Sequence, residues 1–390
     1  MTGLLIRLFV RDAENVKDPK VREAYGKLAG AAGMVSNALL AAAKVLLGWI
    51  FGSVAIIADG INNVTDAASS LITLISFRLA AQPADKEHPY GHARIEYIAG
   101  LMVSFMALYL GVQLFITSVK KILAPEPTEF SWLTLGVLAL AIAVKLWQAG
   151  FYIKLGTRIK SATIKATGAE SRNDVISTAA VIVGVLVEKV TGLQVDGWVG
   201  ALAAAYIVYS GIELVKETSA PLLGELPDEE LVADIKERIM AFDGVLGIHD
   251  LIVHNYGPGR IFASVHVEVP ADEDVLKSHD LMDNIERQLA KDLGLQLVCH
   301  MDPLDTKDPF LAEAATCVQK VLKQIPCKTS IHDLRVVTGP THKNIVFDIV
   351  VPHEFPWSEE KISAFVAEKM QEQNCSYYTV VTVDRLFVKE

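Results

Sequence analysis

Four polar residues with a repeated spacing lie inside segments that are otherwise apolar enough to span a membrane. Asn62 and Asp66 form one pair and Glu170 and Asp174 form the other, each with three residues between its members. On a helix this spacing puts both members on one face, one turn apart. Polar and ionisable groups at membrane depth are costly, so they usually face a bundle interior and mark an ion pathway. The four residues are therefore the predicted ligands of a divalent cation.

The donor atoms of this predicted site are all oxygens. Such ligands suit hard or borderline cations such as Mn²⁺, Mg²⁺ or Ca²⁺, whereas zinc sites more often include His or Cys. Three crowded carboxylates cannot all stay ionised cheaply, so the empty site is expected to hold protons that an entering metal expels. This gives a physical basis for metal/proton exchange. Asp59, one heptad before Asp66, is a candidate gate or proton-relay residue.

The alternative is that these groups only join helices by hydrogen bonds within a bundle. That alternative stays open for Asn62, but three acids in two segments carry a negative charge that structural hydrogen bonding does not need. Lys44 and Lys145 also lie in apolar segments, and we expect them to snorkel or to pair within the bundle.

A second group of candidate ligands lies between the second and third apolar stretches. Asp85, His88 and His92 occur there within eight residues. Histidine and carboxylate at this density favour a metal site at the cytosolic mouth. The alternative is a turn made by His88-Pro89 and Gly91.

Histidines also gather in the C-terminal half. Strand alternation puts His266 on the polar face of the segment 260–269, with Val265 and Val267 opposite. If neighbouring strands bring their histidines to the same place, a nitrogen and oxygen site for Zn²⁺ or a similar ion results. Its candidate ligands are His249, His266, His300 and Asp302, with His279 on the intervening helix. The alternative is a set of surface histidines that share no ligand.

Six apolar stretches of spanning length position the paired residues. They run near 28–50, 54–80, 97–122, 131–155, 164–190 and 198–215, and Lys and Arg concentrate on one side of them. The positive-inside rule then puts both termini in the cytosol. We therefore expect a cytosolic segment over 1–27 and a six-helix transmembrane domain, bound to the lipid bilayer, over 28–220.

Beyond residue 220 the pattern becomes that of a soluble α+β domain. The order helix, strand, strand, helix, strand over 221–305 predicts a small antiparallel sheet with helices on one face. From Pro221 onward, 29 acidic residues stand against 16 basic ones, whereas 1–220 carry a net charge of +3. Nucleic-acid-binding domains carry a basic surface, so the excess of acidic residues in this half argues against binding to nucleic acid.

An internal repeat extends this half. Ile248–Leu251, read Ile-His-Asp-Leu, recurs as Ile331–Leu334, and a Gly-Pro turn follows each, at 257–258 and 339–340. A second α+β unit is therefore predicted over 306–390. It is a candidate surface for an enlarged dimer contact or for another protein.

The second unit lacks the histidines of the first. Asp348 stands at the position of His266 and Thr382 at that of His300, although Asp384 matches Asp302. We therefore expect it to bind no metal.

These motifs resemble those of the cation diffusion facilitator family. The similarity covers about residues 20–305 and rests on Ala58-Asp-Gly-Ile-Asn-Asn-Val-Thr-Asp66, His88-Pro-Tyr-Gly-His92, Ser171-Arg-Asn-Asp174 and His300-Met-Asp-Pro303. It implies a homodimeric metal/proton antiporter with six spans per protomer and a ferredoxin-like cytosolic tail. It also implies a transport site at Asn62, Asp66, Glu170 and Asp174, a loop site at Asp85, His88 and His92, and a tail site at His249, His266, His300 and Asp302, with His279 nearby.

Two positions bear on the metal. Zinc-transporting members typically have His or Asp where this chain has Asn62, and His where it has Glu170. Asn in the second span with acids in the fifth resembles the bacterial manganese-exporting branch, whose third position is usually Asp. The resemblance thus implies an exporter in the inner or plasma membrane that prefers Mn²⁺, exchanges it for protons and needs no cofactor. Export of Zn²⁺, Fe²⁺, Co²⁺ or Cd²⁺ is the alternative.

Two functions of other classes compete with transport. An integral-membrane metalloenzyme would need a catalytic motif, and the spans contain neither HExxH nor Gly-x-Ser-x-Gly, so we do not expect an enzyme. A membrane metal sensor that does not transport would need only the tail, and ion flux distinguishes it from a transporter.

Overall fold

The computed structural model describes residues 2–16, 18–51, 54–124, 131–308, 310–338, 343–372 and 377–385. The chain divides into two units. The first consists of Met1–Glu225 with Tyr256–Arg260, and the second of Leu226–Asn255 with Ile261–Glu390. The Gly-Pro turn expected at 339–340 lies outside the described residues.

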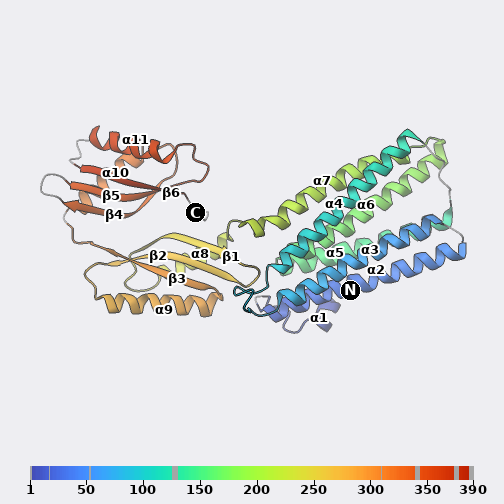
Figure 1. Ribbon diagram of the computed structural model, residues 1–390, viewed down its shortest axis with the longest axis horizontal. Helices are drawn as coiled ribbons and strands as arrows, with labels where there is room; N and C mark the ends of the chain where they lie inside the picture. The colour runs from blue at the N-terminus through green and yellow to red at the C-terminus, as the bar shows by residue number, and fades with distance from the viewer. Residues whose placement is uncertain are drawn as a thin grey trace. The chain divides into compact units, whose positions relative to one another are not determined.

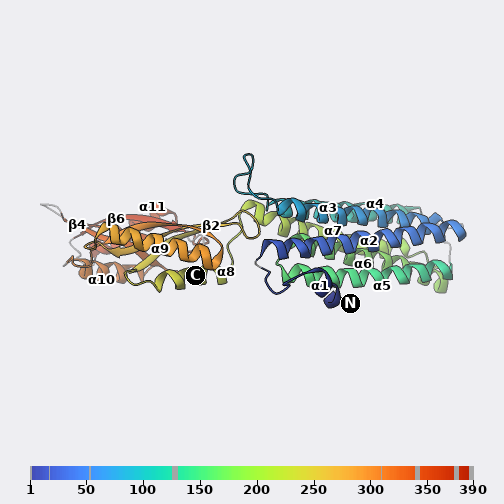
Figure 2. The same ribbon diagram turned by 90° about the horizontal axis from the view of Figure 1, so that it is seen from below.

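Six long helices make up most of the first unit. After the short α1 (Thr2–Phe9) they are α2 (Pro19–Phe51), α3 (Val54–Ala80), α4 (Ile95–Leu123), α5 (Trp132–Arg158), α6 (Ala162–Thr191) and α7 (Asp196–Leu223). Each of the six predicted spans is one of these helices, although α2 begins well before the predicted Leu28. In Figures 1 and 2, α2 lies along α3, α4 along α7 and α5 along α6.

Composition separates the six helices into two groups. Among the described residues, α2, α4, α5 and α7 are long and apolar enough to cross a membrane. The helices α3 and α6 are long enough but not apolar enough by the same criterion. These two carry the paired acids, and Asp66 and Glu170 are only 6% and 4% exposed. Asp66 of α3 and Glu170 of α6 thus face the inside of the bundle.

Close helix approach is made possible by glycine. A Cβ on Gly30 of α2 would lie 2.7 Å from the Leu74 backbone nitrogen of α3, and one on Gly211 of α7 would lie 3.0 Å from the Leu108 Cα of α4. In lipid, helix association depends on such packing, because the surrounding chains are as apolar as the side chains. Small residues therefore hold the α2–α3 and α4–α7 pairs together.

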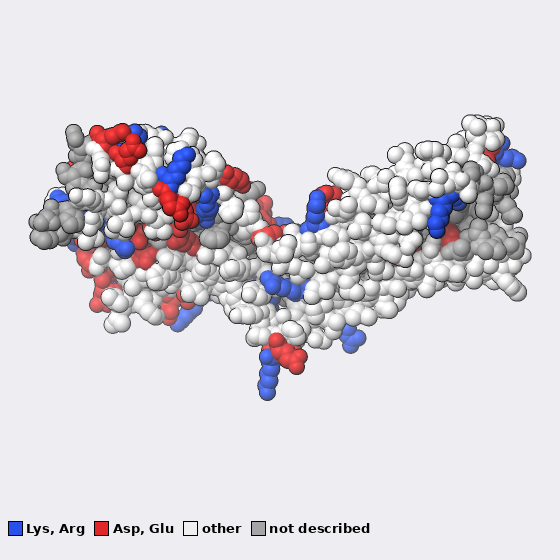
Figure 3. All heavy atoms as spheres, turned by 45° about the horizontal axis from the view of Figure 1, so that its top comes forward, with Lys and Arg blue, Asp and Glu red and all other residues white. Residues whose placement is uncertain are grey.

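The outer flank of the helices is apolar. Leu39, Trp198 and Leu202 are each at least 66% exposed. On the face shown in Figure 3, charged atoms are sparse along the helices and dense on the tail. An uncharged flank of this kind suits contact with lipid.

The second unit begins with the order predicted from the sequence. Its elements are α8 (Glu229–Met240), β1 (Gly247–Asn255), β2 (Ile261–Pro270), α9 (Val275–Leu293) and β3 (Gln296–Leu304), which we call the first copy. β1 and β2 are antiparallel, but β2 and β3 are parallel. The prediction of an all-antiparallel sheet is therefore wrong, because α9 carries the chain back and β3 starts at the same end as β2.

Helices and strands of the first copy share one core. Val265 and Val267 of β2 are fully buried against Ile235 of α8 and Ile285 of α9. The alternation leaves His266, between the two valines, on the other face of the sheet. The sequence prediction for this strand is confirmed.

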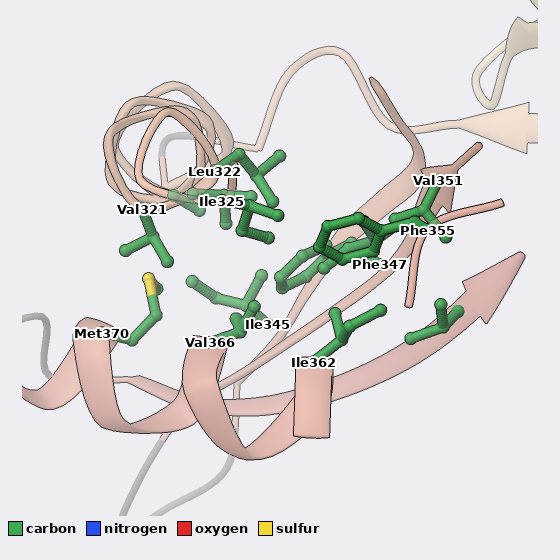
Figure 4. Close-up of a cluster of buried hydrophobic side chains, with 14 residues drawn as sticks. Val321, Leu322, Ile325, Ile345, Phe347, Val351, Phe355, Ile362, Val366 and Met370 are labelled. Atoms are coloured by element: carbon green, nitrogen blue, oxygen red, sulfur yellow. The ribbon is translucent and has the colours of Figure 1, made fainter. Parts of the chain in front are cut away.

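The second copy repeats the fold. It consists of α10 (Leu311–Leu322), β4 (Ser330–Thr338), β5 (Lys343–Val351), α11 (Glu359–Glu372) and β6 (Tyr377–Arg385), with the same strand pairing. The first strand of each copy bulges at the same place, where Asp250 and Asp333 have φ angles of 49° and 54°. Figure 4 shows its separate core, in which Phe347 of β5 lies among side chains from both helices.

Candidate metal centres

Three acidic side chains of α3 and α6 lie around a lysine of α5 in the first unit. The Lys145 Nζ atom is 2.7 Å from Asp66 Oδ2 and 2.6 Å from Asp174 Oδ2, so one ammonium group bridges the two predicted pairs. Lys145 is only 5% exposed and Asp66 only 6%. The carboxylates of α3 and α6 therefore converge on a place that already holds one positive charge.

The second lysine predicted to pair within the bundle, Lys44 of α2, joins the same polar cluster. Its Nζ donates to Asn63 Oδ1 at 2.6 Å, and Asn63 Nδ2 donates to Asp66 Oδ2 at 2.9 Å. Lys44 also lies 2.7 Å from Asp59. The candidate relay residue Asp59 is thus linked to Asp66 through Lys44 and Asn63.

The residue beside Asp66 is Asn63 and not the predicted Asn62. Asn63 is 3% exposed, whereas Asn62 lies on the exposed side of α3. One residue turns a helix by about 100°, so neighbouring asparagines face different surroundings. The structure therefore assigns contact with Asp66 to Asn63, and Asn62 as a metal ligand stays a prediction.

Glu170 is held from the side of α3. The Ser69 hydroxyl donates to Glu170 Oε1 at 3.0 Å, and one turn farther along the hydroxyls of Thr73 and Thr167 lie 3.4 Å apart. All four side chains are buried. A polar contact between α3 and α6 thus extends beyond the acids, toward the start of α6.

The loop residues predicted to bind metal are close to one another. Asp85 Oδ1 is 3.6 Å from His88 Nδ1, and Asp85 Oδ2 is 3.4 Å from His92 Nε2. The backbone N–H groups of His88 and Glu87 donate to the Asp85 carboxylate and hold its pKa below the usual range. One ligand atom from each of the three predicted residues lies within 4.8 Å of the others.

The predicted tail histidines line up across three strands of the first copy. His249, His266 and His300 are register partners on β1, β2 and β3. Asp302 of β3 lies close to all three. One of its carboxylate oxygens is 3.1 Å from His249 Nε2 and 2.8 Å from His266 Nδ1, and the other is 3.3 Å from His300 Nε2. The four residues form a nitrogen and oxygen cluster, whereas His279 lies exposed on α9 and does not belong to this cluster.

A hydrogen bond between two neighbouring residues of β1 shifts the pKa values of both. Burial lowers the pKa of His249, but its hydrogen bond with Asp250 and the nearby acids raise it more, so that the net shift is upward. The same hydrogen bond lowers the pKa of Asp250. The histidine and the carboxylate thus stabilise each other in their charged forms.

The second copy contains a cluster that the sequence analysis did not anticipate. Ligand atoms of His332, Asp348 and Asp384 lie within 4.8 Å of one another. Burial, with Asp250 and Asp348 nearby, raises the pKa of Asp384. The substitutions at Asp348 and Thr382 do not remove every candidate ligand, because His332, the counterpart of His249, supplies an imidazole; whether this copy binds metal stays a prediction. The repeated Ile-His-Asp-Leu motif could have revealed this cluster.

Comparison with known families covers both units. A family model described as the cation efflux transmembrane domain matches residues 31–223, and one described as the cation efflux protein cytoplasmic domain matches residues 227–304. The chain belongs to the cation diffusion facilitator family. The matched ranges take in α2–α7 and the first copy, and they end before the second copy.

Three similar proteins match this chain over most of their own length. The cation-efflux pump FieF of Klebsiella pneumoniae is 29% identical over 73% of this chain and 95% of its own. The manganese efflux system protein MneS of Bacillus subtilis is 28% identical, over 69% and 92%. An uncharacterized transporter of Methanocaldococcus jannaschii is 28% identical, over 66% and 90%.

Family membership settles the general function. This cation diffusion facilitator is a divalent cation efflux transporter and not an enzyme. It is a multi-pass membrane protein whose C-terminal domain is cytoplasmic.

Proposed function

We propose that this transporter exports Mn²⁺ in preference to other divalent cations and takes up protons in exchange, as a homodimer in the plasma or inner membrane with both termini cytosolic. The observation that carries the proposal is the position of Lys145. Its buried ammonium group is paired with Asp66 of α3 and Asp174 of α6, which are the ligands predicted for the cargo.

The charges around Lys145 suit a divalent cargo. With all three acids ionised, Asp66, Glu170 and Asp174 together with Lys145 carry a net charge of −2. A divalent cation would neutralise this group. Because the group is buried, the electrostatic energy gained on neutralisation is much larger than it is in water. When the cargo is absent, Lys145 stays paired with the carboxylates of Asp66 and Asp174. The remaining carboxylate, Glu170, is then neutralised by a proton.

The cargo and the ammonium group compete for the same oxygens. As the metal binds, Lys145 gives up at least one of its carboxylates, and as the metal leaves on the other side, Lys145 returns. Rocking of α3 and α6 relative to the other helices exposes the site to each side in turn. Asn62, one turn before Asp66, is the proposed fourth ligand, reached from the exposed side of α3.

The donor atoms favour manganese over zinc. The acids and amides around Lys145 offer oxygen ligands, which suit Mn²⁺, whereas Zn²⁺ sites more often include imidazole or thiolate. Similarity to the manganese efflux protein of Bacillus subtilis supports this preference, although the equally similar Klebsiella protein is named only as a cation-efflux pump. Zinc export by the same mechanism is the second candidate.

The test is metal flux into proteoliposomes under an imposed pH gradient. We expect Mn²⁺ flux well above Zn²⁺ flux, abolished by Asp174→Asn and retained by Glu213→Gln, which changes an exposed acid of α7. Zinc flux equal to or above manganese flux would mean that geometry or hydration, and not ligand type, sets selectivity. Absence of both fluxes in a folded dimer would favour a sensor that does not transport.

A further inference from the structure

The ring nitrogens of one buried histidine in the second copy make no hydrogen bond among the described residues. This histidine, His332 of β4, is 8% exposed, and both of its ring nitrogens are buried. A buried polar group left unpaired costs about 1–3 kcal/mol, so an arrangement of this kind calls for a ligand.

Carboxylates from both copies point at this ring. The His332 Nε2 atom lies 3.4 Å from Asp384 Oδ2 of its own copy and 3.5 Å from Asp250 Oδ1 of the first copy. Asp348 is the register partner of His332 on β5, and ligand atoms of His332, Asp348 and Asp384 lie within 4.8 Å of one another. These separations are too long for good hydrogen bonds but suit atoms that share one metal ion between them.

The two copies meet at equivalent residues. The rings of His249 and His332, which occupy the same position in the two repeats, stack with centroids 4.1 Å apart and an angle of 16° between their planes. Asp250 belongs to the bulge of β1, whose backbone turn brings its carboxylate between the copies. Strands β3 and β4 are also in contact.

We propose that His332, Asp348 and Asp384 of the second copy, together with Asp250 of the first, bind a cytosolic divalent cation that joins the two copies. One imidazole and three carboxylates form a nitrogen and oxygen ligand set that accepts Mn²⁺ or Zn²⁺. The site is separate from the cluster around His266, because three of its four ligands come from β4, β5 and β6.

The ion has a mechanical role in this arrangement. Without it, three carboxylates crowd around one buried ring, and their mutual repulsion weakens the contact between the copies. With it, β1 of the first copy and the sheet of the second copy are tied to one centre. Cytosolic metal would thus set how firmly the second copy is held against the first.

The number of ions bound by the full-length chain in detergent tests the proposal. Each variant is incubated with Mn²⁺ or Zn²⁺ alone, freed of loose metal by desalting and analysed for metal per chain. We expect His332→Ala and the nearly isosteric Asp384→Asn each to bind one ion per chain fewer than the parent. His254→Ala, which changes an exposed histidine of the same unit, should bind as many ions as the parent.

Hydrogen exchange of the same proteins supplies an independent readout. Added metal should slow exchange in β4 of the parent and of His266→Ala, but not in β4 of Asp384→Asn. Equal metal content in the parent, His332→Ala and Asp384→Asn would overturn the proposal, as would equal protection of β4 in the parent and Asp384→Asn. Because neither readout involves flux, the result does not depend on which metal is transported.

Discussion

At the scale of single residues, the decisive feature is a lysine placed among acids. Lys145 holds Asp66 and Asp174 together, while Lys44 holds Asn63 and Asp59. Each buried positive charge offsets part of a negative cluster that would otherwise be too costly inside a bundle. The proposed transport site is therefore a group of carboxylates with two buried lysines paired to it.

Replacing Lys145 with Met should make the protein depend on metal for its stability. Removal of one partner from a buried ion pair costs about 3–5 kcal/mol, because the other charge is left uncompensated. We expect a lower melting temperature without metal and a larger rise on adding Mn²⁺ than in the parent, measured by thermal unfolding in detergent. An Mn²⁺-induced rise equal to that of the parent would show that Lys145 and cargo do not compete.

The two neighbouring asparagines should respond differently to substitution. Asn63→Ala removes one buried hydrogen bond from Lys44 and one from Asp66, and is expected to destabilise the protein by about 1–3 kcal/mol. Asn62→Ala should leave stability unchanged and lower Mn²⁺ flux, because we propose it only as a ligand. Thermal unfolding and flux, measured on both variants, separate the roles. Unchanged flux in Asn62→Ala would remove Asn62 from the site.

At the scale of helices and strands, the two units obey different rules. The helices of the first unit approach through glycine, as at Gly30 and Gly211, and their polar faces turn inward. The sheets of the second unit alternate buried aliphatic and half-buried polar residues, so that His249, His266 and His300 become neighbours through strand register alone.

Packing of α4 against α7 should be sensitive to one methyl group. Gly211→Ala places a Cβ 3.0 Å from the Leu108 Cα, and overpacking of this kind costs about 1–3 kcal/mol. Gly136→Ala is the matched control, because nothing lies within 4 Å of its Cβ and alanine favours helix by about 0.5–1 kcal/mol. Thermal unfolding should show the first variant less stable and the second at least as stable as the parent; the reverse order would contradict the packing argument.

Metal binding by the first copy should weaken as the pH falls. A histidine must lose its proton to bind a metal, and the raised pKa of His249 means that it holds this proton at higher pH than a free histidine does. In a chain ended after Asp305, which lacks three of the four ligands proposed between the copies, metal content should fall at a higher pH than it does in the same chain with Asp250→Asn, which lacks the charge that stabilises the imidazolium. Identical pH profiles would show that Asp250 does not control the site.

Much of this arrangement was predictable from sequence, and the rest depends on contacts between elements. Spacing within one helix revealed Asp66, Glu170 and Asp174, and alternation within one strand revealed the face of His266. Nothing within a single helix indicates that Lys145 of α5 reaches two other helices, or that Asn63 is turned inward in place of Asn62. The parallel pairing of β2 with β3 likewise depends on the path of α9.

At the scale of the whole molecule, the chain contains one transport domain and two similar tail copies with separate cores. The core of the first copy consists of residues between Val232 and Leu297, and that of the second of residues between Ala314 and Val383. The family models likewise end at residue 304. The second copy thus has a core of its own and lies outside the range that the family model matches.

A chain ended after Asp305 should therefore still transport. All buried residues of the first core remain, so we expect a folded dimer with Mn²⁺ flux close to that of the full chain. The same truncation should remove the ion proposed between the copies, which metal analysis would detect as one ion per chain fewer. Loss of flux in a folded truncated dimer would show that the second copy takes part in transport.

The stacking of His249 on His332 affects how mutation can change the contact between the two copies. In a symmetric dimer every substitution appears on both sides of the interface at once, whereas here each side is encoded separately. One side can therefore change alone, as Asp348 and Thr382 already differ from His266 and His300. Because a short connection after Leu304 tethers the copies, with an effective concentration on the order of millimolar, their contact is also independent of how much protein the cell makes.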